Sequence, residues 1–325
     1  VELSRSHPGR FRLLETFRQY GTAQLTSVEQ KELAQRHSML VAGKMNVIQR
    51  SIGQHDDTSA QAELSLLWPD LRATQRRLDP SQAAPMLAGL GIESLFRERF
   101  EIGTWIDRIL DQQSDLDEVE LIETLATGSL QDWIRGSFDR GLERWSTARA
   151  LQQKLGLPMT PALGFAGGVQ LAVQHDYERA ALDLLDSIQQ LRDQDDEFGE
   201  LHVWVGPGLA HLSHTGRSAD ALEQLDSLQP RIDSLSNPHL TAHAANRRPS
   251  ALVNIDPESA IEASHAALHA AETAGTTWTV GAVRNYLAYA YVATNAYQSA
   301  ARTLLAQLSA VRDGASSQSL ANTLR

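Results

Sequence analysis

Cysteine is absent from the 325 residues of this sequence. Its absence excludes disulfide bonds, zinc sites with cysteine ligands, iron–sulfur clusters and a thiol nucleophile. No apolar run approaches the roughly 20 residues that a membrane-spanning helix needs. Residues 1–12 are too polar and charged for a secretory signal peptide. We therefore expect a cytoplasmic protein that has no membrane partner.

Lysine is nearly absent as well, because Lys31, Lys44 and Lys154 are the only three. Acidic residues outnumber lysine and arginine by 40 to 29, which gives a formal net charge of −11. A surface of this sign argues against direct contact of this segment with nucleic acid. Aromatic residues make up only 6% of the chain, whereas alanine and leucine are abundant, and this composition favours helices.

An internal repeat is the clearest pattern in the chain, and it begins after residue 80. A small residue recurs near the start of one amphipathic helix after another, at intervals of 38 to 41 residues. Small side chains at such points let two packed helices approach closely. These anchor residues are Gly103, Gly141, Ala180, Ala221, Ala260 and Ala300.

Capping residues keep the same register as the anchor residues. Three side chains that can accept the free N–H groups of a first helical turn lie four residues before an anchor. They are Ser137, Asp176 and Asp256. Three glycines, which adopt the left-handed conformation of a helix C-cap without strain, lie 14 or 15 residues after an anchor. They are Gly156, Gly275 and Gly314.

Each repeat is therefore predicted to be two helices joined by a short turn. One such pair cannot bury both of its apolar stripes alone, so neighbouring pairs must stack. The sequence predicts an all-α fold, an α-solenoid of six helical pairs resembling tetratricopeptide (TPR) repeats, over residues 81–314. The expected pairs are residues 81–113, 118–156, 159–194, 199–236, 239–275 and 277–314. Residues 315–325 are expected to be a frayed or truncated end.

The first 80 residues lie outside the repeat. Residues 10–14 predict a short strand and residues 15–25 a helix. A long helix is expected over residues 27–52, beginning with Ser27 and Gln30 at capping-box spacing. A further helix is expected over residues 60–78.

Residues 9–21, GRFRLLETFRQYG, resemble the R-[YF]-R-L-L-E-T-[IVF]-R-[QE]-Y segment of bacterial STAND-type signalling ATPases. In that family the segment is the closing strand and helix of a winged-helix domain that follows the ATPase core. The stretches ELAQRH (residues 32–37) and ELSLLWPDLRATQRRL (residues 63–78) are similar to later helices of the family, although Trp68 and Pro69 depart from its pattern. Beyond residue 78 the resemblance is one of architecture.

The resemblance implies that residues 1–26 end a winged-helix module and that residues 27–80 are linking helices. Family members are typically transcriptional regulators of the LuxR or AfsR/SARP type, some fused to adenylate cyclase. This chain would then be the sensor arm of such a regulator, binding a protein or small-ligand inducer on its concave surface. ATP and Mg²⁺ would bind an upstream ATPase domain in cis, and another part of the parent protein would bind DNA.

A free-standing TPR-like scaffold or peptide receptor is the alternative interpretation. The chain begins with Val1 rather than methionine, which is compatible with a fragment of a longer protein or with an unusual start. Both interpretations assign a binding function to the helical array.

The sequence offers no motif for catalysis or for a cofactor. Gly43-Lys44 is the only Gly-Lys pair, and Ser38 and Met45 stand where a phosphate-binding loop needs glycine and a hydroxyl residue. Two glycine-rich stretches, residues 167–168 and 206–208, lack the strand–turn–helix context of a dinucleotide site. They indicate a close-packing patch and a helix kink. We expect no catalytic residue and no cofactor in this chain.

A metal site is not expected either. Glu262, His265 and His269 share one helix face, but a carboxylate-bridged site needs a second such set on a facing helix. The acidic run over residues 193–197 lacks the central glycine and ligand spacing of a calcium loop.

The candidate partner-binding residues are Asn246, Arg247, Arg248, Arg284 and Asn285. They lie on the expected first helices of the fifth and sixth pairs, which in solenoids usually line the concave surface. Polar and cationic groups there can bind a peptide or an anionic ligand. The alternative is a solvated face, or one that forms ion pairs between repeats.

Overall fold

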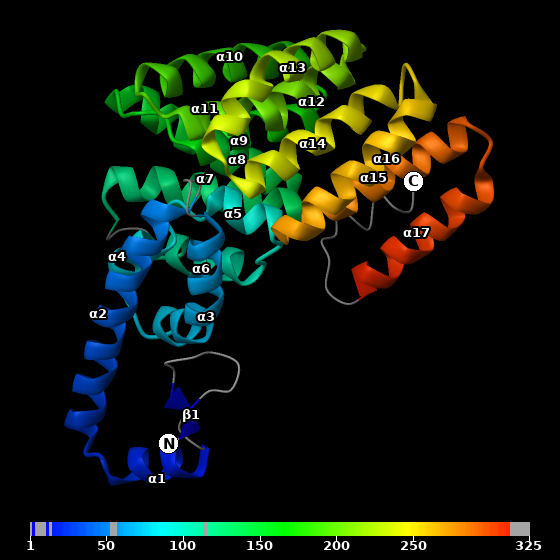
Figure 1. The fold of residues 1–325 in the computed structure, drawn as a ribbon. Helices are drawn as coiled ribbons and strands as arrows, with labels where there is room; N and C mark the ends of the chain where they lie inside the picture. Colours follow the sequence, from blue (N-terminus) through cyan, green and yellow to red (C-terminus); the bar gives the residue numbers. More distant parts are fainter. Residues whose placement is uncertain (1, 4–10, 13–14, 53–56, 113–115, 313–325) are drawn as a thin grey trace.

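A computed structural model describes residues 2–3, 11–12, 15–52, 57–112 and 116–312 of the chain (Figure 1). An N-terminal arm leads into an array of antiparallel helices, which curves until its last pairs return beside its first. The all-α solenoid that the sequence predicts is confirmed. None of the helices in the described ranges is both long and apolar enough to span a membrane.

The N-terminal arm contains one short strand pair and three helices. Its elements are β1 (Glu2–Leu3), β2 (Phe11–Arg12), α1 (Glu15–Gln24), α2 (Ser27–Ser51) and α3 (Asp57–Gln75). The strands are antiparallel and place Leu3 opposite Phe11. The strand predicted over residues 10–14 is thus seen at Phe11–Arg12, while residues 10, 13 and 14 lie outside the described ranges. The winged-helix assignment of residues 1–26 stays a prediction.

The predicted capping box of α2 was wrong by one residue. Thr26 is the N-cap, where the Thr26 hydroxyl accepts from the backbone N–H of Glu29 at 3.3 Å and the Glu29 carboxylate accepts from the backbone N–H of Thr26 at 2.8 Å. The Gln30 amide instead donates to the backbone oxygens of Thr22 and Leu25 at the end of α1. A carboxylate is the better partner at a helix N-terminus because the helix dipole favours negative charge there.

The first pair of the array is irregular. In place of two long helices it contains α4 (Pro80–Ala83), the 3₁₀ turn η1 (Ala84–Met86), α5 (Gly91–Phe96) and α6 (Glu101–Leu110). Pro85 cannot donate to an α-helical ladder, and Gly89 adopts a φ of +72°. The chain therefore turns twice before α5 begins.

The remaining five pairs follow the repeat. Their elements are α7 (Glu118–Arg135), α8 (Phe138–Leu155), α9 (Pro161–Val173), α10 (Tyr177–Asp193), α11 (Glu197–Val203), η3 (Trp204–Gly208), α12 (Leu209–His214), α13 (Ser218–Leu235), α14 (Pro238–Leu252), α15 (Pro257–Ala274), α16 (Thr277–Ala293) and α17 (Tyr297–Arg312). Residues 315–325 lie outside the described ranges, so the frayed end stays a prediction.

The expected caps are mostly confirmed. Asp176 and Asp256 accept from backbone N–H groups three residues later, and Gly156 and Gly275 end their helices at φ of +62° and +66°. The Ser137 side chain makes no capping bond. Instead, the Ser137 backbone N–H donates to the backbone oxygen of Asp132 at 2.8 Å and completes the C-cap of α7. This bond sets the backbone conformation between α7 and α8. Gly314 lies outside the described residues.

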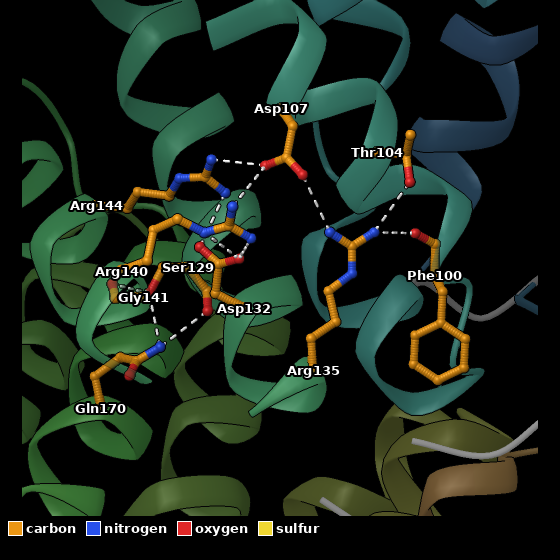
Figure 2. A network of polar contacts seen from close by, with 10 residues as sticks. All are labelled: Phe100, Thr104, Asp107, Ser129, Asp132, Arg135, Arg140, Gly141, Arg144 and Gln170. Carbon is orange, nitrogen blue, oxygen red and sulfur yellow. Dashed lines mark hydrogen bonds and ion pairs between the residues drawn. The ribbon is translucent and has the colours of Figure 1, made fainter. Parts of the chain in front are cut away.

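Figure 2 shows what the anchor glycine of the second pair accommodates. A Cβ on Gly141 would lie 2.2 Å from the side-chain nitrogen of Gln170 on α9. That buried amide donates to the backbone oxygen of Ser129 at 2.9 Å, and the Ser129 hydroxyl donates to the Gly141 oxygen at 2.8 Å. The anchor position therefore holds a buried polar bridge between consecutive pairs.

An ion-pair network joins the first and second pairs (Figure 2). Asp107 of α6 pairs with Arg135 at 3.3 Å and with Arg144 at 2.7 Å. The buried Asp132 carboxylate pairs with Arg144 at 2.9 Å and with Arg140. Burial raises the pKa of Asp132, although hydrogen bonding and charge from the two arginines oppose the shift. Ion pairs that are buried in this way add little net stability, because the cost of desolvating the charges offsets their attraction.

The solenoid closes on itself through α5. The Arg97 guanidinium donates to the backbone oxygen of Gly275 at 3.1 Å, and the Thr277 hydroxyl donates to the backbone oxygen of Phe96 at 3.5 Å. The Phe96 ring also packs against Trp278 at a centroid distance of 5.3 Å. The first pair therefore contacts the start of the sixth directly.

Candidate functional site

A pocket of about 470 Å³ lies on the inner face of the array. Its walls come mainly from the first helices of five successive pairs: α7, α9, the helix interrupted at η3, α14 and α16. This volume lies within the roughly 300–1,000 Å³ of small-ligand pockets. The aromatic lining residues are Trp133, Phe165, Tyr177, Trp278, Tyr286 and Tyr289.

Two glycines allow α9 and the helix interrupted at η3 to pack closely in the pocket wall. A Cβ on Gly168 would lie 2.4 Å from Cβ of Pro207, and a Cβ on Gly206 would lie 2.3 Å from the Phe165 ring. Residues 204–208 form a π-helical turn, a local widening that is frequent at functional sites. The close-packing patch at residues 167–168 is confirmed. At residues 206–208, where a kink was predicted, the helix is interrupted by this π-helical turn.

The pocket wall shares residues with a buried aromatic cluster around Phe96, which is 0% exposed. The Phe96 ring lies 4.4 Å from the ring of His243, 4.6 Å from that of His239 and 5.9 Å from that of Phe165. Phe165 and Trp278 belong both to this cluster and to the pocket wall. A ligand in the pocket therefore touches the rings that enclose α5.

The histidines of this cluster are neutral at physiological pH. Burial lowers the pKa of His202 to about 4 and holds the pKa of His239 and His243 well below the usual range. The only sequence signal for this cluster is the four-residue spacing of His239 and His243. Its rings come from pairs far apart in the chain, so no local pattern contains them.

Arg247 supplies a buried cation at the pocket. Its side chain lines the pocket while only 5% of the residue is exposed. One guanidinium nitrogen, Nη2, lies 3.2 Å from Nε2 of His243, and Nε has no hydrogen-bond partner among the described residues. Burial lowers the pKa of Arg247, and the neighbouring Tyr286 partly offsets this shift. The pocket lining contains no aspartate or glutamate in the described part of the chain.

The five predicted partner-binding residues divide between several environments. Arg247 and Asn285 line the pocket. Arg248 pairs with Asp226, and Arg284 lies 3.7 Å from Glu272, so both take part in ion pairs between helices. Asn246 is fully buried, away from the pocket lining, and its side-chain atoms have no hydrogen-bond partner among the described residues. A binding role for these residues stays a prediction.

The aromatic walls were missed from the sequence, since none of the six aromatic lining residues is among the candidate binding residues. Trp145 lies in the core at 1% exposed. Trp278 is only half-buried and faces the pocket. The spacing of Ala282, Tyr286 and Tyr289 along one face of α16 was the available signal.

The described ranges contain no candidate metal site. No group of three or more histidine, aspartate or glutamate side chains there could hold a metal ion. His265 lies 3.4 Å from the Tyr291 hydroxyl, on the outer helix of its pair. The pocket instead combines apolar walls with one buried cation, which suits binding.

No model of a known protein family matches this sequence, and no curated protein matches it. Among solved structures, NprR in complex with its cognate peptide NprX is similar in fold, with a TM-score of 0.62. The match covers 87% of this chain and 82% of the NprR chain at 11% sequence identity. At this identity the likeness shows the α-solenoid fold alone.

Proposed function

We propose that this chain is a sensor that binds a short peptide on the inner face of its helical array. The observation that carries the proposal is the pocket itself, because five successive pairs contribute to one site. A ligand there contacts all five pairs and favours the curvature that fits it best. The complex of NprR with a peptide supports a peptide as the ligand class.

We further infer that the array is the sensor arm of a STAND-type transcriptional regulator acting in the cytoplasm. The support is the resemblance of residues 9–21, together with a helical array in the position that the family gives it. Ligand binding would then bias an upstream ATP- and Mg²⁺-binding domain in cis through its unequal affinity for two states. DNA would be bound elsewhere in the parent protein.

The coding sequence upstream of Val1 tests this placement. An open frame that encodes the phosphate-loop pattern G-x-x-x-x-G-K-[ST] would support the regulator. A stop codon close upstream would contradict it. The second candidate, a free-standing peptide receptor, would then be favoured, since the likeness to NprR extends over 82% of that chain.

The binding proposal is tested by filling the pocket. Ala282 is half-buried and lines the pocket, so Ala282→Phe places a ring in the space that a ligand would take. Ala266 is exposed on α15 and lies outside the pocket lining, which makes Ala266→Phe the matched control. A synthetic pool of random pentapeptides is selected on the wild-type chain, and retained peptides are titrated by tryptophan fluorescence.

We expect the wild type and Ala266→Phe to bind alike, and Ala282→Phe to bind at least about tenfold more weakly, a difference of about 1.4 kcal/mol. Retention of no peptide, or equal binding by all three proteins, would show that the pocket is not the binding site.

A further inference from the structure

We propose that Arg247 is the anchor for a carboxylate group of the ligand. The proposal rests on the proposed function and specifies the chemistry of its ligand. It would make the ligand an amphipathic acid, a peptide whose carboxylate pairs with Arg247 while its apolar part packs against the surrounding rings.

The first step is that Arg247 carries a charge that the described part of the protein does not neutralise. It forms no ion pair with a carboxylate there, and its guanidinium contacts the neutral His243 at 3.2 Å. A buried charge without a partner is strongly unfavourable. The other two candidate arginines, Arg248 and Arg284, lie outside the pocket lining and each has an acidic partner.

The second step concerns the kind of anion that fits. A guanidinium can bind both oxygens of a carboxylate in one plane, and the free Nε of Arg247 is one of the donors of that geometry. Trp133, Phe165 and Trp278 form the apolar wall of the same pocket. The anion therefore belongs to a molecule with an apolar body, which a terminal or side-chain carboxylate of a peptide provides.

The third step is that, among the described residues, no carboxylate of the pocket lining pairs with Arg247 in place of a ligand. The formal net charge is −11, yet the pocket lining holds the cation of Arg247 and, in the described residues, no carboxylate. Burial lowers the pKa of the lining residues His211 and His214, so they stay neutral beside it. The pocket is thus a local site of positive charge on an acidic molecule. An acidic ligand can enter without displacing an internal ion pair.

The test uses the full chain and one synthetic pentapeptide pool prepared in two forms. The first form has free C-terminal carboxylates and contains Asp and Glu. In the second form the C-termini are amidated and Asn and Gln replace the acids. Retention of both forms is measured on the wild type, on Arg247→Met and on the control Arg248→Gln, whose arginine is paired with Asp226.

We expect the wild type and Arg248→Gln to bind peptides from the acidic form roughly tenfold to hundredfold more tightly than their neutral counterparts. Arg247→Met should lose this preference. Equal retention of both forms by the wild type, or an acid preference that survives in Arg247→Met, overturns the carboxylate anchor and leaves the binding pocket standing. Retention of neither form overturns both.

Thermal unfolding without any peptide gives a second readout. If the Arg247 charge is unpaired until a ligand binds, Arg247→Met removes an uncompensated buried charge, so the Tm of the unliganded protein stays the same or rises. A fall in Tm of several degrees would instead assign Arg247 to folding and overturn the proposal.

Discussion

At the scale of single residues, burial and neighbouring charges have opposite effects on the pKa of Glu93 in α5. Its carboxylate lies 2.8 Å from Nε of Arg97 and 3.7 Å from Nε of Arg99, and its side chain is 1% exposed. His239 lies 3.9 Å away and is neutral. Burial outweighs both arginines and raises the pKa of Glu93 to about 7.

This shift predicts a dependence of stability on pH. The folded-state pKa of Glu93 lies above its ordinary value of 4.5, so its contribution to stability is complete below the lower value and is lost as pH rises through the higher one. Glu93→Gln stays neutral throughout. The free energy of unfolding of Glu93→Gln relative to wild type should therefore rise by up to about 3 kcal/mol between pH 5 and pH 8.

Denaturant unfolding of both proteins at several pH values in that range checks this expectation. The buried histidines are neutral in both folded proteins over this pH range, so their effect cancels in the difference. A difference in unfolding free energy that stays constant with pH would show that Glu93 is ionised in the folded protein throughout.

At the scale of elements, the same substitution in two helices should have opposite effects. A Cβ on Gly43, in the exposed middle of α2, meets nothing within 4 Å, so Gly43→Ala should stabilise the fold by up to about 1 kcal/mol through helix propensity. Gly141→Ala displaces the buried Gln170 amide. The lost hydrogen bond should cost about 1–3 kcal/mol and outweigh that gain.

Urea unfolding of the two variants measures both changes. Stabilisation by Gly141→Ala would mean that Gln170 adjusts at no cost, and that the small anchor residues reflect helix spacing alone.

Helices and their caps could be predicted from the sequence where the residues that determine them are neighbours in the chain. The caps at Asp176 and Gly275 depend on a few neighbouring residues, and the anchor spacing repeats along the chain. The short α5 was not foreseen, because the residues that hold Phe96 and Arg97 lie about 180 positions later. Sequence periodicity describes contacts between neighbouring pairs and contains no information on closure.

At the scale of the whole molecule, closure through α5 connects the pocket to both ends of the array. Phe165 and Trp278 form the pocket wall and also enclose Phe96. The same α5 is separated from the N-terminal arm only by α4 and η1 in the chain. We therefore expect a ligand to tighten α5 and α16 together rather than to order one repeat alone.

The pocket could be predicted only in part, because its walls depend on contacts between helices that are distant in the sequence. Arg247 and Asn285 could be chosen because they are polar positions on first helices. The aromatic walls could not, since whether Trp278 faces the core or a cavity depends on how five helices rotate relative to one another.

Amide hydrogen exchange with and without a selected acidic pentapeptide tests the central claim most directly. Binding in the inner pocket predicts slower exchange in α9, α14 and α16, and at the same time in α5, because a ligand raises the free energy of local opening where it binds. Protection confined to the outer helices α8, α10 and α13, or no change at all, would contradict a ligand site on the inner face.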